Sequence, residues 1–210
     1  MSLADIRREY LGQPLSESDS DPNPFRQFER WFAQVRELEP DATEMALATA
    51  SRDGCPSVRT VLLKGMDDRG FVFYTNYNSR KAKDLTATGR GSLMFYWRSL
   101  ERQVRIDGRA ERVSAEESDA YFATRPIESR WSVYASRQSE VIESREVLES
   151  RFATARQEYG DRVRRPAWWG GYRIVPDAFE FWQGRPNRLH DRLRYVKDAS
   201  GVWRRERLAP

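Results

Sequence analysis

Cysteine is almost missing from this sequence, since Cys55 is the only one among 210 residues. This excludes a disulfide bond within the chain and a metal site built from several thiolates. Histidine is equally scarce, with His190 alone, so we expect no bound metal. No apolar run is long enough to cross a bilayer, and Met1 to Tyr10 contains no apolar signal core. These absences favour a cytoplasmic protein without membrane contact.

Charge of one sign is only slightly in excess. The chain has 36 basic and 32 acidic residues, a net charge of +4, spread along its length. A nucleic-acid interface needs a concentrated basic stripe, so we expect no nucleic-acid partner. Aromatic residues are plentiful by contrast, with 7 Trp, 9 Tyr and 10 Phe at a mean hydropathy of −0.81. This combination predicts aromatic surfaces sealed by Arg-rich edges, partly against a second subunit.

The pattern predicts a polar arm followed by one domain. Residues 11–24 are polar and interrupted by prolines, so we expect a mobile N-terminal arm over 1–24 and a single domain over 25–210. Periodicity and turn residues predict helices at 25–38, 79–85, 114–124 and 140–159, and strands at 45–50, 57–64, 71–75, 92–97, 103–113, 171–175, 178–182, 192–196 and 202–207. This order predicts a mainly β fold, bordering on the α+β class, with antiparallel strands in a barrel and helices packed outside it.

The first cluster of functional candidates spans two predicted strands and a helix start. It contains Arg59-Thr-Val-Leu-Leu-Lys64, Tyr74-Thr75 and Ser79-Arg80-Lys81. Cations in the first helical turn oppose the helix dipole, and a bound phosphate would resolve that conflict. A phosphate site and a solvated basic turn are equally open from the spacing alone.

A second cluster follows in Tyr121-Phe-Ala-Thr-Arg125-Pro126 and Ser129. Tyr121 and Arg125 are four residues apart on one side of a helix, and Pro126 ends that helix. The two hydroxyls and the guanidinium would form a second phosphate site. Alternatively, Arg125 only compensates the helix dipole while Tyr121 is a core residue.

The single histidine lies in Arg188-Leu-His-Asp-Arg192. Strand alternation would place Arg188, His190 and Arg192 on one face of an extended segment. Two neighbouring guanidiniums oppose protonation of His190, so a neutral imidazole is expected, suited to orienting a substrate or handling a proton. An edge strand with a structural histidine is the competing interpretation.

Most of the aromatic residues at 168–172 and 179–182 are expected in the core or in a subunit interface. One or two of them could pack against a flat heteroaromatic ring of a ligand. A stacking platform for nucleic acid is disfavoured, because these residues are not interleaved with a basic stripe. Together the clusters indicate two anion sites, a flat apolar slot and one neutral histidine. That combination fits a phosphorylated aromatic cofactor beside a phosphorylated aromatic substrate.

Taken together, the motifs resemble those of the pyridoxamine 5'-phosphate oxidase family from Arg7-Arg-Glu-Tyr10 to Arg207-Leu-Ala-Pro210. The matching segments also include 59–64, 73–76, 79–81, 101–104, 138–139, 181–184 and 188–192. The resemblance implies an FMN-binding split β-barrel working as a homodimer, with FMN at the subunit interface. It implies oxidation of pyridoxamine or pyridoxine 5'-phosphate by O2 to pyridoxal 5'-phosphate, in vitamin B6 biosynthesis and salvage.

The resemblance also implies site residues. Those matching the FMN contacts of the family are Arg59, Thr60, Val61, Leu62, Leu63, Lys64, Tyr74, Thr75, Arg80, Lys81, Gln103, Gln138, Ser139, Trp182 and Arg192. Those matching its substrate contacts are Arg7, Arg8, Glu9, Tyr10, Lys64, Tyr121, Arg125, Ser129, Arg188, Leu189 and His190, of which residues 7–10 match a segment that folds over the site. By the same resemblance Arg188 and His190 are catalytic, because they position the substrate carbon for hydride transfer to flavin N5.

One segment departs from the family pattern. Ser132-Val133-Tyr134 stands where the family usually has a Gly-Ala-Trp-like run, and larger side chains there would reshape the pocket. A related oxidase acting on another substrate therefore stays open, such as the phenazine-biosynthesis enzymes. Those enzymes depart from a lysine at the position of Lys64, so its presence favours the vitamin B6 substrate. A non-catalytic flavin- or pyridoxal-phosphate-binding protein is the third hypothesis, and the presence of Arg188 and His190 argues against it.

Overall fold

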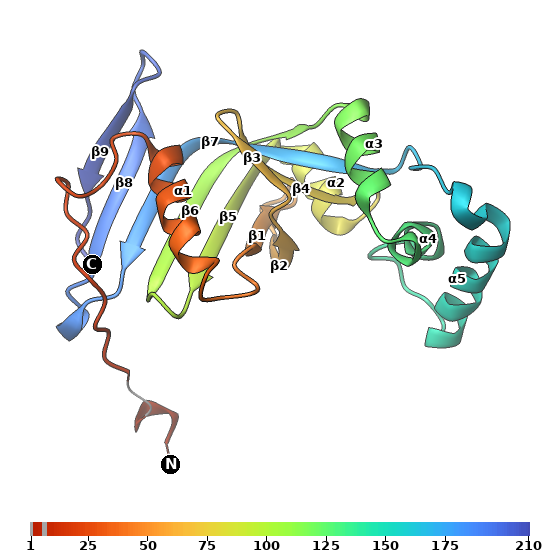
Figure 1. The fold of residues 1–210 in the computed structure, drawn as a ribbon, viewed down its shortest axis with the longest axis horizontal. Coiled ribbons are helices and arrows are strands. Elements are labelled where there is room, and N and C mark those ends of the chain that lie inside the picture. Colours follow the sequence, from red (N-terminus) through yellow and green to blue (C-terminus); the bar gives the residue numbers. More distant parts are fainter. Residues whose placement is uncertain (1, 6–7) are drawn as a thin grey trace.

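The structure is a computed structural model that describes residues 2–5 and 8–210. In that part of the chain, nine strands form one curled antiparallel sheet (Figure 1). Its strands are β1 (Glu44–Ala50), β2 (Pro56–Leu62), β3 (Gly65–Asp67), β4 (Gly70–Asn76), β5 (Arg90–Trp97), β6 (Arg102–Arg112), β7 (Trp169–Gln183), β8 (Asp191–Lys197) and β9 (Trp203–Arg207). The order across the sheet is β2-β1-β5-β6-β7-β4-β3, and β8 and β9 continue from β7.

The two end strands of this sheet order, β2 and β3, follow one another in the chain, so the sheet curls back on itself. The backbone N–H of Lys64, just after β2, donates to the carbonyl of Val72 in β4 at 2.8 Å. β4 pairs with the first half of β7, and β8 pairs with the second half of β7. The mainly β, antiparallel barrel-like fold predicted from the sequence is confirmed.

Five α-helices lie outside this sheet: α1 (Pro24–Val35), α2 (Arg80–Thr88), α3 (Ala115–Thr124), α4 (Ile127–Ala135) and α5 (Arg145–Tyr159). Figure 1 shows α1 lying across the sheet near β5 and β6, while α3, α4 and α5 gather at the opposite end of the molecule. Short 3-10 turns occur at Leu3–Asp5, Gly160–Arg162 and Pro186–Arg188. None of the helices in the described residues is long and apolar enough to cross a membrane.

The main core lies between α1 and the concave face of the sheet. Phe28 of α1 is fully buried, and its ring meets those of Phe71 and Phe95 edge-on, with centroids 4.9 and 5.0 Å away. Trp31 and Val35 continue the same buried helical face, as the 3.6-residue periodicity predicts. A second core joins α3, α4 and α5 around Phe122, Trp131, Val133, Ala155, Val163 and Trp169.

Two helix predictions need correction at their ends. α1 ends at Val35 instead of Leu38, which is 57% exposed. The N–H groups of Leu38 and Glu39 both donate to the Val35 carbonyl at 2.8 Å, so residues 36–39 form a turn instead of continuing the helix. α5 begins at Arg145 instead of residue 140, and the segment before it is irregular.

Helix α4 was not predicted. Pro126 ends α3, as expected, but it also occupies the N-cap position of α4. A proline at the start of a helix has no N–H to leave unpaired there, so one residue both breaks one helix and begins the next.

Strand β7 is one continuous strand where the sequence predicted two. Pro176 and Asp177 read as a break, but they stay in the sheet because β6 and β7 shift register between Asp107 and Gly108. Such a bulge accommodates a proline that cannot donate to the ladder. A Cβ on Gly108 would lie 2.2 Å from the carbonyl oxygen of Val175, so the bulge requires a glycine there.

We expect Gly108→Ala to lower the free energy of unfolding by about 1–3 kcal/mol, because the added methyl group must displace backbone atoms of β7. Gly65→Ala is the matched control, because its Cβ would meet the Val72 side chain at an ordinary 3.6 Å. Urea unfolding of both variants measures the difference. Equal stability of the two variants would contradict the close packing at the bulge.

Candidate active site

A cavity of about 540 Å³ opens between the sheet and the group of α3 and α4. β2 and β4 form one wall, α2 contributes its first turn, and α3, α4 and the segment around Gln138 form the rest. Its lining includes ten of the residues predicted from the sequence: Thr60, Val61, Leu62, Lys64, Tyr74, Thr75, Lys81, Tyr121, Arg125 and Gln138. The two predicted anion sites of this half of the chain therefore share one cavity, which we call the barrel cavity.

The start of α2 brings buried donors to the barrel cavity. Ser79 occupies the N-cap position and is fully buried, yet its Oγ has no hydrogen-bond partner in the described part of the chain. Lys81 in the first turn is only 7% exposed, and burial, with Arg59 nearby, lowers its pKa. The N–H of Arg80 donates to Ser139 Oγ at 3.2 Å. This helix start thus offers one unpaired hydroxyl group and positive charge.

Arg59 is held rigidly beside this helix start. Its guanidinium donates to the Leu47 carbonyl at 3.0 Å, to Thr49 Oγ1 at 2.8 Å and to Ser57 Oγ at 2.6 Å. Thr49 in turn donates to the buried carboxylate of Asp84 at 2.7 Å. Burial lowers the pKa of Arg59, although Asp84 opposes that shift. The network fixes a cation next to Lys81.

The opposite wall carries a second unpaired cation. Nη1 of Arg125 is buried without a hydrogen-bond partner among the described residues, and burial lowers the pKa of this guanidinium. The guanidinium lies over the Trp169 ring at 4.7 Å. Tyr121 stacks on Tyr74 with centroids 3.9 Å apart, and burial raises the pKa of Tyr74 to about 12, so both phenols stay protonated donors near neutral pH.

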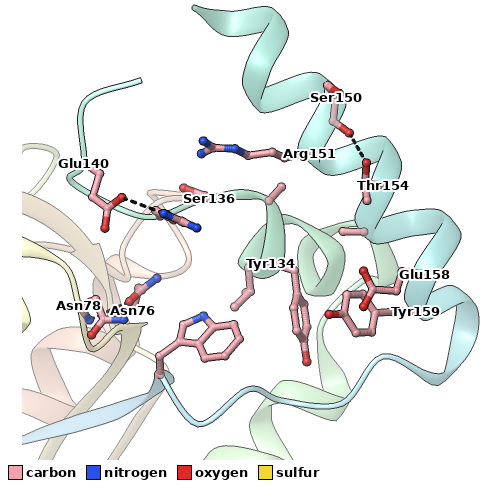
Figure 2. A pocket seen from close by; sticks show the side chains of 15 residues that line it. Asn76, Asn78, Tyr134, Ser136, Glu140, Ser150, Arg151, Thr154, Glu158 and Tyr159 are labelled. Carbon is pink, nitrogen blue, oxygen red and sulfur yellow. Dashed lines mark hydrogen bonds and ion pairs between the residues drawn. The ribbon is translucent and has the colours of Figure 1, made fainter. Parts of the chain in front are cut away.

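A larger neighbouring cavity of about 640 Å³ lies between α4, α5 and the turn after β4 (Figure 2). Tyr134 stacks on Tyr159 there with centroids 4.1 Å apart, and the Arg137 guanidinium faces Glu140 at 3.9 Å. Carboxylates and guanidiniums both line it, and none of the predicted site residues does. It therefore lacks the excess of desolvated cations that marks the barrel cavity.

The other predicted residues gather at the far end of the sheet. Gln103, Trp182 and Arg192 are direct cross-strand neighbours on β6, β7 and β8. Beside them a cavity of about 840 Å³ lies between the N-terminal arm and the turn after β7. Its lining contains Arg8, Glu9 and Tyr10 of the arm together with Arg188 and His190. We call this region the turn site.

His190 has a defined hydrogen bond in the turn site. The backbone N–H of Arg185 donates to its Nδ1 at 3.0 Å. The imidazole also lies 4.7 Å from the Trp182 ring and edge-on to Tyr10 at 5.4 Å. Burial, and secondarily the charge of Arg188, lowers the pKa of His190. The direction agrees with the sequence-based expectation, but the main cause is burial, and Arg192 is not among the causes.

The prediction that Arg188 to Arg192 form an extended segment is wrong. Pro186–Arg188 forms a 3-10 turn, Asn187 and Arg188 have positive φ angles of 56° and 61°, and β8 begins only at Asp191. Arg188 and His190 therefore lie on a turn while Arg192 lies on a strand. Pro186 and the hydrogen bond from Leu189 N–H to the Pro186 carbonyl account for the turn.

The two regions lie at opposite ends of β7. Trp169, the first residue of β7, lines the barrel cavity, while Trp182, the last but one, belongs to the turn site. At about 3.3 Å per residue, the two tryptophans are roughly 40 Å apart along the strand. Within one chain, the predicted residues form two half-sites.

A few predicted residues lie outside both groups. The Leu63 side chain belongs to the core, and Ser129 lies on α4 where its carbonyl accepts a bond from Ser132 Oγ. Leu189 is exposed, and Arg7 falls outside the described residues.

Sequence reasoning named Ser79 in the first cluster and Trp169 among the aromatic residues that could wall a flat ring, but it assigned neither a contact. It missed other residues that line the barrel cavity: Asn76, Ser132, Val133 and Ser136. For Asn76 a signal existed, because it belongs to a segment that resembles the family. Ser132 and Val133 were noted only as a departure from the family pattern.

Comparison with known proteins agrees with this geometry. The pattern of the family described as pyridoxamine 5'-phosphate oxidase matches residues 32–159, and that of the pyridoxine 5'-phosphate oxidase C-terminal dimerisation region matches residues 169–210. The pyridoxine/pyridoxamine 5'-phosphate oxidases of Burkholderia multivorans and Bordetella petrii are 55% and 54% identical, covering 100% of this chain and 99% and 100% of theirs.

Solved structures agree as well. PhzG from Burkholderia lata, in complex with tetrahydrophenazine-1-carboxylic acid, has a TM-score of 0.87 at 34% identity, covering 95% of this chain and 99% of that one. A pyridoxamine 5'-phosphate oxidase-related, FMN-binding protein from Nostoc punctiforme has the same fold, with a TM-score of 0.74 at 16% identity over 90% of this chain and 100% of that one. From the two matching patterns and the full-length relatives, the chain belongs to the FMN-binding pyridoxamine 5'-phosphate oxidase family.

Proposed function

We propose that this protein oxidises pyridoxamine 5'-phosphate or pyridoxine 5'-phosphate to pyridoxal 5'-phosphate with O2, using FMN and releasing hydrogen peroxide. Ammonia is a further product from the amine substrate. The observation that carries the proposal is a pair of buried, unpartnered donors: Arg125 in the lining of the barrel cavity, and Ser79 at the start of the helix whose Lys81 lines the cavity. Desolvated donors of this kind are stable when an anion completes them.

The residues of the barrel cavity fit FMN. The orphaned hydroxyl of Ser79, the cation of Lys81 and the first N–H groups of α2 would hold the flavin phosphate. The side chains of Thr75 and Gln138, joined by a hydrogen bond of 3.1 Å, would add polar contacts to the cofactor. When bound, FMN accepts two electrons from the substrate and passes them to O2.

The chain's own residues supply binding and orientation. Arg125, with its unpaired Nη1, and the protonated hydroxyl of Tyr121 would hold the substrate phosphate, and Lys64 adds positive charge at the same cavity. His190 accepts at Nδ1, so its neutral imidazole carries the proton on Nε2 and presents a donor there. Arg188 would place a second donor near the reacting carbon, and Tyr10 would exclude water from above.

We infer further that the active enzyme is a homodimer whose sites are shared. The C-terminal match is to a dimerisation region, and it contains Trp182, Arg188, His190 and Arg192. The roughly 40 Å of β7 between the half-sites prevents one chain from bringing them together. A twofold partner would place its turn site over the barrel cavity of the first subunit, with FMN between them.

A related oxidase for a different ring system is the second candidate. The PhzG structure is a close structural neighbour, and Ser132 and Val133, which depart from the family pattern, line the barrel cavity. The greater identity to the pyridoxine/pyridoxamine 5'-phosphate oxidases favours the vitamin B6 substrates.

The function is tested with the purified protein loaded with FMN. Under anaerobic conditions, pyridoxamine 5'-phosphate should bleach the flavin absorbance, because the substrate reduces the cofactor. In air the same mixture should produce pyridoxal 5'-phosphate and hydrogen peroxide in equal amounts. A flavin that stays oxidised with both the amine and the alcohol substrate would contradict the proposal and favour the second candidate.

We expect Arg125→Gln to raise KM for pyridoxamine 5'-phosphate about tenfold or more, because a charge-assisted hydrogen bond to phosphate is lost. FMN affinity, measured by flavin fluorescence, should change less than about twofold. Arg145→Gln is the matched control, because Arg145 is an exposed arginine on α5 outside the barrel cavity. Equal effects of Arg125→Gln on FMN and on substrate binding would refute the assignment of Arg125 to the substrate.

Mixed dimers test the shared site. We expect Arg125→Ala and Arg188→Ala chains to be nearly inactive alone, since each damages every site in its own dimer. In a heterodimer of the two, one site carries both changes and the other carries neither. Random exchange of the subunits should therefore restore about a quarter of the wild-type activity. No recovery after proven exchange would show that each site lies within one chain.

A further inference from the structure

The turn that carries Arg188 and His190 has an unfavourable backbone. Asn187 and Arg188 are consecutive residues with positive φ angles, and neither is a glycine. Such conformations cost free energy and persist only where surrounding contacts hold them. The contacts that hold this turn therefore control where its two functional side chains lie.

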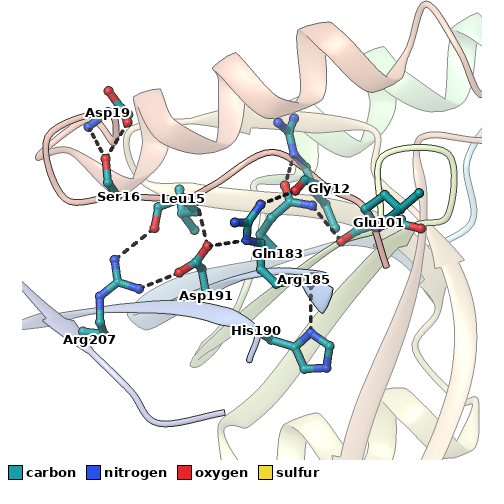
Figure 3. Close-up of polar contacts among 12 residues, drawn as sticks. Gly12, Leu15, Ser16, Asp19, Glu101, Gln183, Arg185, His190, Asp191 and Arg207 are labelled. Atoms are coloured by element: carbon teal, nitrogen blue, oxygen red, sulfur yellow. Dashed lines mark hydrogen bonds and ion pairs between the residues drawn. The ribbon is translucent and has the colours of Figure 1, made fainter. Parts of the chain in front are cut away.

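Asp191 is at the centre of those contacts (Figure 3). Its carboxylate accepts from Arg207 Nη1 at 2.8 Å and from the backbone N–H of Leu15 at 3.1 Å, and it pairs with Arg185 Nε at 3.5 Å. One side chain thus connects the N-terminal arm, the start of the turn and the end of β9.

Arg185 contacts both Asp191 and His190 and so connects them. Its side chain is held on one side by Asp191 and on the other by the carbonyl of Gly12. Its backbone N–H donates to His190 Nδ1. This bond selects the imidazole tautomer with the proton on Nε2, because a nitrogen that accepts a hydrogen bond cannot carry the proton.

Arg207 connects the same carboxylate to the arm. Its guanidinium forms a two-point pair with Glu17 at 2.8 and 2.7 Å and donates to the Leu15 carbonyl at 3.0 Å. Arg207 therefore holds residues 15–17 against β9 while it orients Asp191. The arm therefore helps to hold in place the turn that carries Arg188 and His190.

We propose that Asp191 is a positioning residue that holds Arg188 and His190 in their reactive arrangement by joining Arg185, Leu15 and Arg207. The inference rests on the proposed function, in which Arg188 and His190 meet the substrate. Asp191 itself touches no reacting atom in this scheme.

A purely structural ion pair at the sheet edge is the competing explanation. Exposed pairs contribute little to stability, and their loss has no reason to change the tautomer of one imidazole. Loss of a positioning residue changes both the imidazole and turnover while leaving FMN binding intact. His190 is the only histidine, so 15N-histidine labelling reports on this one imidazole without assignment.

The test compares Asp191→Asn with Glu206→Gln in the full-length FMN-loaded enzyme. Glu206 lies next to Arg207 on β9, and its change removes a comparable ion pair, Arg194–Glu206 at 2.6 Å, that does not reach the turn. We expect Asp191→Asn to lower kcat/KM about tenfold or more. The His190 imidazole should also lose its preference for the tautomer with the proton on Nε2. Glu206→Gln should match the wild type in both, and both variants should bind FMN within about twofold of it.

Asp191→Glu, which keeps the charge, should recover part of the lost turnover. If Asp191→Asn does not fold, Arg207→Gln replaces it, with a several-fold loss of kcat/KM and a partial loss of the tautomer preference expected. Wild-type turnover and a wild-type imidazole spectrum in the folded variant would overturn the inference. An inactive wild-type enzyme would instead refute the proposed function, while the imidazole spectra would still decide the role of Asp191.

Discussion

The length and stiffness of β7 determine how this protein can build a site. The strand pairs with β6 along nearly its whole length, and it also holds β4 and β8. It stays continuous past Pro176 because Gly108 permits a bulge opposite it. A strand paired in this way cannot fold back on itself, so its two functional ends stay apart. The proposed site uses residues from both ends, which is why we propose that a second copy of the chain completes it.

The buried cations of this protein differ in whether a carboxylate compensates their charge. Arg173 is as buried as Lys81, yet it is paired with both Asp67 and Glu117, and so its burial is compensated within the fold. Lys81 and Arg125 have no such carboxylate among the groups that shift their pKa, and desolvation lowers the pKa of each. An uncompensated buried cation costs stability. The fold tolerates that cost at the walls of one cavity, where phosphorylated ligands are proposed to bind.

The N-terminal arm has a part in this arrangement that its composition conceals. Residues 11–17 look like a polar linker, but their backbone groups and Glu17 bind Glu101, Asp191, Arg185 and Arg207. These are contacts between segments far apart in the sequence. They join the arm to the turn that carries His190, so the position of this turn depends on contacts with the arm.

The sequence by itself determined the strands with clear alternation, the helices with strong caps and the residue types of both half-sites. Ser114, for example, begins α3 and Gly89 ends α2, as local rules predict. Local rules failed at Pro126, which ends α3 and also begins α4. They failed again at Pro176, where a bulge beside Gly108 of β6 keeps β7 continuous. Only the tertiary structure decided that Lys81 and Arg125 share one cavity, that Arg188 lies on a strained turn, and that β7 separates it from that cavity. Burial, register and distance depend on contacts between distant segments, and no local sequence pattern encodes them.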